Sequence, residues 1–337
     1  MLTNDILLVV ITISLAFIFD FLNGFHDAAN SIATVVSTRV LKPHWAVAWA
    51  AFFNFSAIFF FGVHVANTIG TGLIDPSIIT VMVVLISLIS AIVWNIITWY
   101  YGIPSSSSHA LIGGMLGAAI AKSGWGFLNF YGLAKVILAI VISPFIGFII
   151  GQLLMLITIR IFFNFSPSRT NSIFRKMQIF SSALISLGHG GNDAQKTMGI
   201  IAVLLFSTGS LGENFYVPMW VTLGCYFVIS LGTIFGGWRI VKTMGMKITK
   251  LKPVSGCCAE TASALTLFLA TGLGIPVSTT HTITGSIIGV GSLQSTAAVR
   301  WGVARNIVYA WVLTIPAAAI LAGGLWFLTS LFISNIA

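Results

Sequence analysis

Two aspartates stand in matching motifs within otherwise apolar sequence. Asp27 lies in Gly24-Phe25-His26-Asp27-Ala28, and Asp193 lies in Gly190-Gly191-Asn192-Asp193-Ala194. A carboxylate at the centre of a membrane costs about 3 kcal/mol unless cations or donors lie nearby, so such residues usually mark an ion pathway. The alternative is a structural carboxylate that caps the end of a broken helix.

A second pair of motifs carries hydroxyl groups. Gly102-Ile103-Pro104 and Gly274-Ile275-Pro276 are each followed by hydroxyl residues: Ser106, Ser107, Ser108, Ser278, Thr279 and Thr280. Proline suits the first turn of a helix, and a helix start offers unpaired N–H groups and the positive end of the helix dipole. Two such starts facing each other would form a cradle for an oxyanion. Simple N-capping is the alternative for each motif alone.

Amide, imidazole and ammonium groups lie near these motifs. Amides donate and accept, so they can bridge an anion and a cation; the candidates are Asn23, Asn30, Asn192 and Gln195. His109 and His281 are candidates for coupling, while Lys196 either pairs with an aspartate or extends toward the cytoplasm. Ser106 with His109 resembles a hydrolase pair, but no Gly-x-Ser-x-Gly elbow is present, so an enzyme is not expected. Asp20 and Glu260 are also embedded in apolar sequence, and Glu260 is a secondary site candidate.

The elements that position these residues must lie in a membrane. Only 7% of the 337 residues are charged and 57% are hydrophobic, against about a quarter charged in soluble domains. The net charge of +9 comes from basic residues in short loops, which suits cytoplasmic loops better than nucleic-acid binding. We expect an all-α, polytopic membrane protein with about ten to twelve transmembrane segments. Segments 6–22 and 27–38 read as one broken helix, and 104–121 and 277–290 as half-helices or re-entrant hairpins.

The chain repeats itself. Besides the paired motifs, Gly113 and Gly117 align with Gly285 and Gly289, and Pro144 with Pro316, at one offset. The repeats divide the chain into residues 1–170 and 171–337, and the loop charges predict opposite orientations for these halves. Inverted repeats with broken helices at matching positions are typical of secondary transporters.

These motifs resemble those of the inorganic phosphate transporter family, which includes bacterial low-affinity phosphate permeases and sodium-phosphate symporters of eukaryotes. The matching stretches are 21–30, 190–193, both Gly-Ile-Pro motifs, 237–239 and 247–251. The large hydrophilic domain that many relatives carry between the halves is absent here. His26 stands where many relatives have Asn, a variant that resembles the proton-coupled bacterial branch.

The resemblance implies two inverted repeats around a central anion site, in a homodimer in the cytoplasmic membrane. The implied anion site uses Asp27, Asn30, Ser106, Ser107, Ser108, Asn192, Asp193, Gln195, Ser278, Thr279 and Thr280. The implied cation sites share Asn23, Asp27, Asn192 and Asp193, and the two aspartates are the metal ligands if the cation is Na⁺. No cofactor is expected besides co-transported H⁺ or Na⁺.

Charge balance then predicts symport by alternating access. An anion that enters a cell moves against the inside-negative membrane potential, and this work is about 2.3 kcal/mol per charge per 100 mV. Two aspartates also repel a dianion until cations bind. An acceptor carboxylate favours phosphate, which carries a P–OH donor, over sulfate, and arsenate is expected to compete. The alternatives are a symporter of sulfate or of a metal–phosphate complex, with Mg²⁺ as the metal, a divalent-metal carrier, and an anion channel.

Overall fold

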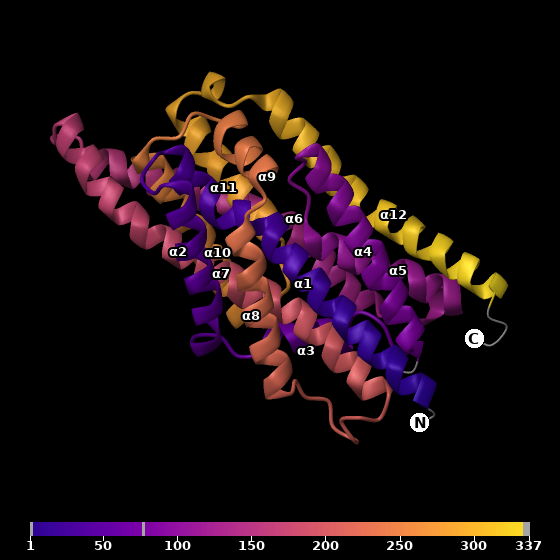
Figure 1. The fold of residues 1–337 in the computed structure, drawn as a ribbon. Coiled ribbons are helices and arrows are strands. Elements are labelled where there is room, and N and C mark those ends of the chain that lie inside the picture. The colour runs from indigo at the N-terminus through magenta and orange to yellow at the C-terminus, as the bar shows by residue number, and fades with distance from the viewer. Residues whose placement is uncertain (1–2, 76–77, 333–337) are drawn as a thin grey trace.

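The computed structural model describes residues 3–75 and 78–332, and side chains from residue 6 onward, and it is all-α over these ranges (Figure 1). The elements in chain order are α1 Thr3–Ser37, α2 Pro43–Ser56, η1 Ala57–Phe59, α3 His64–Gly72, α4 Val81–Tyr101, α5 Ser107–Ser123, η3 Trp125–Phe127, α6 Phe130–Ile161, α7 Pro167–Ser207, α8 Met219–Phe235, α9 Trp238–Lys242, η4 Thr243–Lys247, α10 Pro253–Gly272, α11 Thr279–Gln294, η5 Thr296–Ala298 and α12 Trp301–Phe332.

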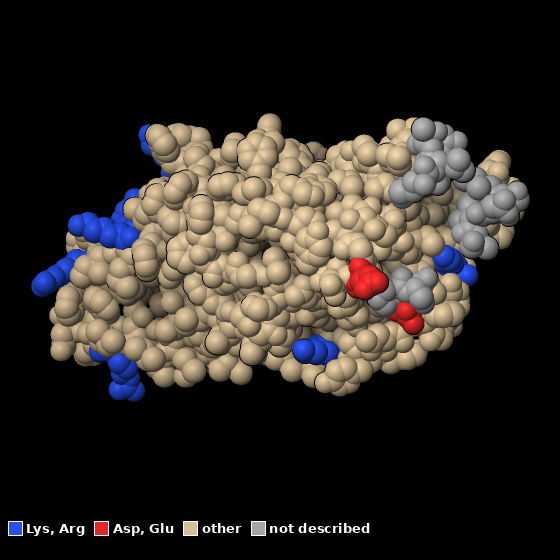
Figure 2. All heavy atoms as spheres, turned by 90° about the horizontal axis from the view of Figure 1, so that it is seen from below, with Lys and Arg blue, Asp and Glu red and all other residues tan. Residues whose placement is uncertain are grey.

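The outer surface of the bundle suits lipid. Large apolar side chains are exposed along the outer helices, among them Phe145 on α6 and Ile320 on α12. Figure 2 shows a surface with few charged side chains, and most of the visible Lys and Arg side chains lie at one end of the molecule. Because so few charges interrupt this surface, the expectation of a polytopic, all-α membrane protein is confirmed.

Judged by helix length and composition, the structure has fewer candidate membrane spans than the expected ten to twelve. Five helices of the described ranges are long and apolar enough to cross a membrane, and the count rises to seven if two bent pairs each form one span. The half-helices α5 and α11 have 17 and 16 residues and fall short of the usual 20. The expected ten to twelve segments counted such short pieces as spans.

The predicted helix break beside Asp27 is wrong. α1 continues through Asn23 and Gly24 without interruption, and α7 likewise continues through Gly190 and Gly191. Gly24 is needed for contact rather than for a break, because a Cβ atom there would lie 2.0 Å from the carbonyl oxygen of Ile229 on α8. The bends occur instead between α2–η1 and α3, at 80°, and between α8 and α9–η4, at 63°.

The prediction of half-helices at the Gly-Ile-Pro motifs is confirmed in outline. α5 begins at Ser107 and α11 at Thr279, and each is short. The prolines lie before the first turn rather than in it, since Ser106 and Ser278 are the N-cap residues and accept hydrogen bonds from the N–H groups of His109 and His281. The backbone therefore reaches each helix start in an extended conformation.

The two short helices pack reciprocally. α5 lies along α12, and α11 lies along α6, so each short helix contacts the long helix of the other half of the chain. The repeat-matched glycines make these contacts: a Cβ atom would lie 2.2 to 2.5 Å from a carbonyl oxygen of the facing helix at Gly113, Gly117, Gly285 and Gly289. The equivalent contacts in both halves show why the sequence repeats these glycines at one offset.

We expect Gly117→Ala to lower the melting temperature in detergent. Its Cβ atom would lie 2.2 Å from the carbonyl oxygen of Ala319, and overpacking of this kind costs about 1–3 kcal/mol. Gly324→Ala on α12 is the matched control, because among the described residues no atom beyond its own helical turn lies within 4 Å of the added Cβ. Equal melting temperatures for the two variants would contradict this account of the α5–α12 contact.

Hydrogen bonds join the basic segments in pairs. The Arg175 guanidinium in α7 donates to the carbonyl oxygen of Arg39, 2.8 Å away, and the backbone N–H of Arg300 donates to Ile248 O.

Along α1, Ala16 and Phe19 belong to one apolar cluster and Ile32 and Val35 to another. Asp27 lies between these clusters, so the polar centre divides the apolar core of the bundle.

Candidate anion and cation site

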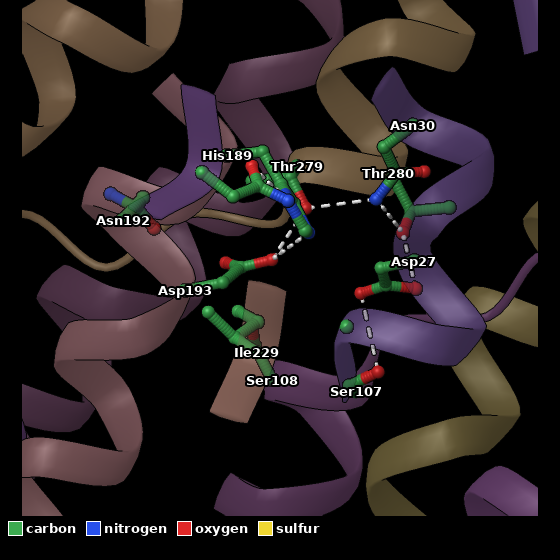
Figure 3. A network of polar contacts seen from close by, with 12 residues as sticks. Asp27, Asn30, Ser107, Ser108, His189, Asn192, Asp193, Ile229, Thr279 and Thr280 are labelled. Carbon is green, nitrogen blue, oxygen red and sulfur yellow. Dashed lines mark hydrogen bonds and ion pairs between the residues drawn. The ribbon is translucent and has the colours of Figure 1, made fainter. Parts of the chain in front are cut away.

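The two motif aspartates meet in the interior of the bundle. Asp27 on α1 and Asp193 on α7 are buried, with 2% and 0% of their surface exposed. One oxygen of each and a ring nitrogen of His189 lie within 4.8 Å of one another (Figure 3). The resemblance implied Asp27 and Asp193 as the metal ligands if the cation is Na⁺. Their proximity to each other and to His189 makes this triad the candidate cation site.

Asp27 is held by groups from both halves. Its Oδ1 lies 2.7 Å from His26 Nδ1, and its Oδ2 accepts a hydrogen bond of 3.2 Å from the Ser107 hydroxyl. The Thr280 hydroxyl donates to Oδ1 at 3.4 Å. Ser107 and Thr280 stand at the starts of α5 and α11, so both short helices contact this carboxylate.

Asp193 is paired with a buried lysine on its own helix. Lys196, three residues later, forms an ion pair with Oδ1, and the Thr279 hydroxyl donates to Oδ2 at 2.8 Å. His189 lies four residues earlier on the same face of α7, with Nε2 3.3 Å from Oδ2. Asp193 therefore has a fixed positive partner in Lys196, whereas the fixed neighbour of Asp27 is the imidazole of His26.

Lys196 pairs with an aspartate and does not extend toward solvent, which decides the alternative left open by the sequence. Its ammonium donates to Ser108 Oγ and to the carbonyl oxygen of Val277, each at 2.6 Å, and only 2% of the residue is exposed. These contacts tie α7 to the starts of both short helices.

The predicted hydroxyl cradle is brought together around the aspartates. The Asn30 amide donates to Thr279 Oγ1 and Thr280 Oγ1, both at 3.0 Å, so α1 also contacts the start of α11. The hydroxyls that converge are those of Ser107, Ser108, Thr279 and Thr280 (Figure 3). Ser106 and Ser278 serve as N-caps one residue earlier.

Like Asn30, the other three predicted amides form no hydrogen bond with either aspartate within the described residues. Asn192 donates to Thr271 Oγ1 at the end of α10, 3.0 Å away, and accepts from the N–H of Val277 before α11 at 3.4 Å. Gln195 accepts from the N–H groups of Val65 and Ala66 at the start of α3. Asn23 is buried, and its Oδ1 accepts no hydrogen bond from the described residues.

The predicted coupling histidines form a buried pair. The rings of His109 and His281 lie edge to face with centroids 4.4 Å apart, and His281 stacks on Trp311 at 3.8 Å. Neither ring nitrogen of His109 has a hydrogen-bond partner in the described part of the chain. Each histidine is the third residue of its short helix, so the pair joins the first turns of α5 and α11.

Sequence reasoning assigned no role at the site to His26, which lies beside Asp27, or to His189, which lies beside Asp193. The signal for His189 was its spacing, because a residue four before Asp193 lies on the same face of a continuous helix. The expected helix break hid this signal. Glu260, the secondary candidate, is fully buried elsewhere and accepts from Thr34 and Ser181 hydroxyls at 2.5 Å and from the Gln178 amide at 2.9 Å.

Comparison with known proteins decides the family. Residues 23–322 match the sequence model described as the phosphate transporter family. The chain belongs to this family. Both paired motifs and all the residues that converge at the centre fall within the matched range.

Several relatives align with this chain over nearly the whole length of both proteins. The chain is 62% identical over 324 residues to a probable low-affinity inorganic phosphate transporter of Rhizobium meliloti, covering 96% of this chain and 97% of that one. It is 46% identical over 332 residues to a protein of the same description from Bacillus subtilis, covering 97% and 99%. A solved structure titled "The sodium-dependent phosphate transporter" superposes with a TM-score of 0.85 at 27% identity, covering 97% of this chain and 100% of that chain. The expectation of a transporter rather than an enzyme is confirmed.

Proposed function

We propose that this chain carries inorganic phosphate, together with cations, across the cytoplasmic membrane. The observation that carries the proposal is the meeting of two helix starts, rich in hydroxyl groups, at a buried pair of aspartates. The relatives described as phosphate transporters support the choice of substrate.

The site offers donors suited to a tetrahedral oxyanion. Ser107, Ser108, Thr279 and Thr280 stand in the first turns of α5 and α11, where backbone N–H groups lack intrahelical acceptors. The Lys196 ammonium lies beside them. An anion at the helix starts would replace the present hydrogen bonds between hydroxyls and carboxylates. Because both aspartates accept hydrogen bonds, they would favour phosphate, which has a P–OH donor, over sulfate.

The charges of the site require cations. Asp27 and Asp193 bring two negative charges and Lys196 one positive charge, so a phosphate dianion would enter a site that is already negative. In a low-dielectric interior this repulsion is large. Bound cations remove it, and binding of cation and anion is then mutually favourable. This linkage is the thermodynamic basis of symport.

The triad of Asp27, His189 and Asp193 also supports a second candidate, a metal–phosphate complex as the cargo. Carboxylates suit Na⁺ or Mg²⁺, whereas the imidazole suits a transition metal better. His26 and Lys196 each engage one carboxylate oxygen and leave the other oriented toward the hydroxyls. Phosphate uptake with and without Mg²⁺ separates this candidate from symport of free phosphate with H⁺ or Na⁺.

Alternating access fits the packing of the bundle. All the converging side chains are buried, so this conformation closes the site on both sides. We propose that residues 1–170 and 171–337 are inverted repeats, as the reciprocal contacts of α5 with α12 and of α11 with α6 suggest. One bundle would rock against the other around the aspartates. A homodimer remains part of the proposal.

Uptake by purified protein in liposomes tests the proposed function. We expect radiolabelled phosphate to accumulate under an inward H⁺ or Na⁺ gradient and to saturate, with competition from arsenate but not from sulfate. Uptake that never saturates would indicate a channel. The absence of phosphate uptake under both gradients, with and without Mg²⁺, would overturn the proposal.

A further inference from the structure

A third acidic residue is buried close to the aspartate pair. Asp20 lies on α1 seven residues before Asp27, which places it on the same face about 10.5 Å along the helix. None of its surface is exposed. The contacts that hold Asp27 and Asp193 do not include it, so Asp20 is outside the candidate anion and cation site.

Among the residues that the structure describes, Asp20 has no cationic partner. The Thr197 hydroxyl donates to Oδ1 at 2.8 Å, and Oδ2 has no hydrogen-bond partner in residues 3–75 and 78–332. The titratable groups that face it are the Cys225 thiol and the Tyr226 phenol from α8 and the Asp193 carboxylate from α7. None of these is positively charged, and the ion pairs of the described ranges all involve Asp27 or Asp193.

Such a carboxylate is stable only when it is neutralised. An unpaired buried charge costs several kcal/mol, and the negative charge of Asp193 adds repulsion. A metal ion would need several oxygen ligands, whereas the hydrogen bond and charge interactions of Asp20 involve one hydroxyl, one phenol, one thiol and the Asp193 carboxylate. A proton needs a single oxygen atom, and Oδ2 supplies it.

We infer that Asp20 binds the proton that is carried with the anion. The inference rests on the proposed function and names the coupling ion and its site. The Asp20 carboxylate takes one proton from one side of the membrane, an O–H bond forms at Oδ2, and this bond breaks when the proton leaves on the other side. No other bond changes.

The position of Asp20 links this proton to the anion site. Thr197, which binds Asp20, is one helical turn after Asp193 on α7. Asp20 precedes Asp27 on α1, so it lies on the side of the site away from the Arg39 loop that follows this helix. If the basic loops are cytoplasmic, as their charge predicts, Asp20 takes its proton from the outer side.

Asp20→Asn separates proton coupling from substrate movement. The amide mimics the protonated acid but exchanges no proton. A gradient of one pH unit supports about a tenfold concentration ratio for each coupled proton. We therefore expect the variant to accumulate about tenfold less phosphate than wild type under this gradient, while phosphate exchange without a gradient stays near the wild-type rate. Asp20→Glu, which still titrates, is the matched control and should accumulate phosphate.

Two further measurements make the test decisive. Infrared spectra of the wild type should contain a protonated carboxylic acid band whose intensity falls in Asp20→Asn; unchanged spectra would overturn the inference. If the Asn variant does not fold, the Glu variant decides, because its exchange rate should show a shifted pH dependence, and an unshifted profile would also overturn the inference.

Other outcomes separate this inference from the proposed function. Wild-type accumulation by Asp20→Asn, or loss of both exchange and accumulation in a folded variant, would overturn the role of Asp20. Uptake by wild type that depends on sodium alone would do the same and leave the proposed function intact. Failure of wild type to move phosphate under any gradient would overturn the proposed function itself.

Discussion

Asp27→Asn and Asp193→Asn are each expected to reduce the initial rate of phosphate uptake by about tenfold or more, the effect of losing hydrogen bonds to a charged group. Each substitution removes a negative charge that holds the cation and an acceptor for the P–OH group. The amides keep the size of the side chains, so the helix packing should persist. Radiolabelled phosphate uptake in liposomes, at matched protein content, measures the effect.

Glu213→Gln is the control for these two variants. It also removes one carboxylate, but Glu213 is exposed in the segment between α7 and α8. Its uptake should equal that of wild type. Wild-type uptake by both aspartate variants would remove the carboxylates from the transport site, whatever the other residues do.

Lys196→Met is expected to abolish uptake and to lower the free energy of unfolding. The substitution leaves Asp193 buried without its ammonium partner, and breaking a buried pair in this way costs about 3–5 kcal/mol. It also removes the donor to Ser108 Oγ and to Val277 O, which orders the starts of α5 and α11. Thermal unfolding in detergent and uptake in liposomes measure the two effects.

The double variant Lys196→Met with Asp193→Asn distinguishes charge from packing. It leaves no unpaired charge at this position, so much of the lost stability should return while uptake stays absent. If the double variant is as unstable as Lys196→Met alone, the lysine stabilises the fold through its hydrogen bonds and not through the ion pair.

The sequence predicted much of the central site because the site residues occur in paired motifs. Asp27 and Asp193, and the hydroxyls of α5 and α11, are such pairs, and in the structure both pairs meet in the interior of the bundle. The single copy of Lys196 had no such support, and its contact with Ser108 depends on how α7 meets α5. A spacing in the sequence could not decide between pairing and exposure.

The helix boundaries were less predictable because contacts between distant residues decide them. Asn23-Gly24 and Gly190-Gly191 are weak helix formers, so a break seemed the natural interpretation. In the bundle these glycines allow α1 to touch α8 and α7 to touch α2, with added Cβ atoms only 2.0 Å from Ile229 O at Gly24 and 2.4 Å from Asn54 O at Gly190. Packing between helices overrides propensity here. The contacts that decide the outcome join residues more than a hundred positions apart.

Asn30 and Asn192 also show that residue type alone does not decide where a side chain lies in the bundle. Asn30 and Asn192 were equivalent candidates by composition, yet Asn30 contacts the start of α11 while Asn192 binds the segment that precedes it. The sequence identified groups able to bridge ions. Which of them face the centre depends on how α1 and α7 are rotated about their axes. Neighbouring residues of a helix point in directions about 100° apart, so spacing alone does not decide this.

The exchange of packing partners between the halves affects how the chain assembles during synthesis. α5 ends at Ser123, but its partner α12 begins only at Trp301, roughly 180 residues later, and ribosomes add about 5–20 residues per second. The face of α5 that carries Gly113 and Gly117 therefore stays unpaired in the membrane for some tens of seconds until α12 is made. During this interval an equivalent helix from another nascent chain can bind to this face. Biogenesis should thus depend on insertion factors that shield this face until translation ends.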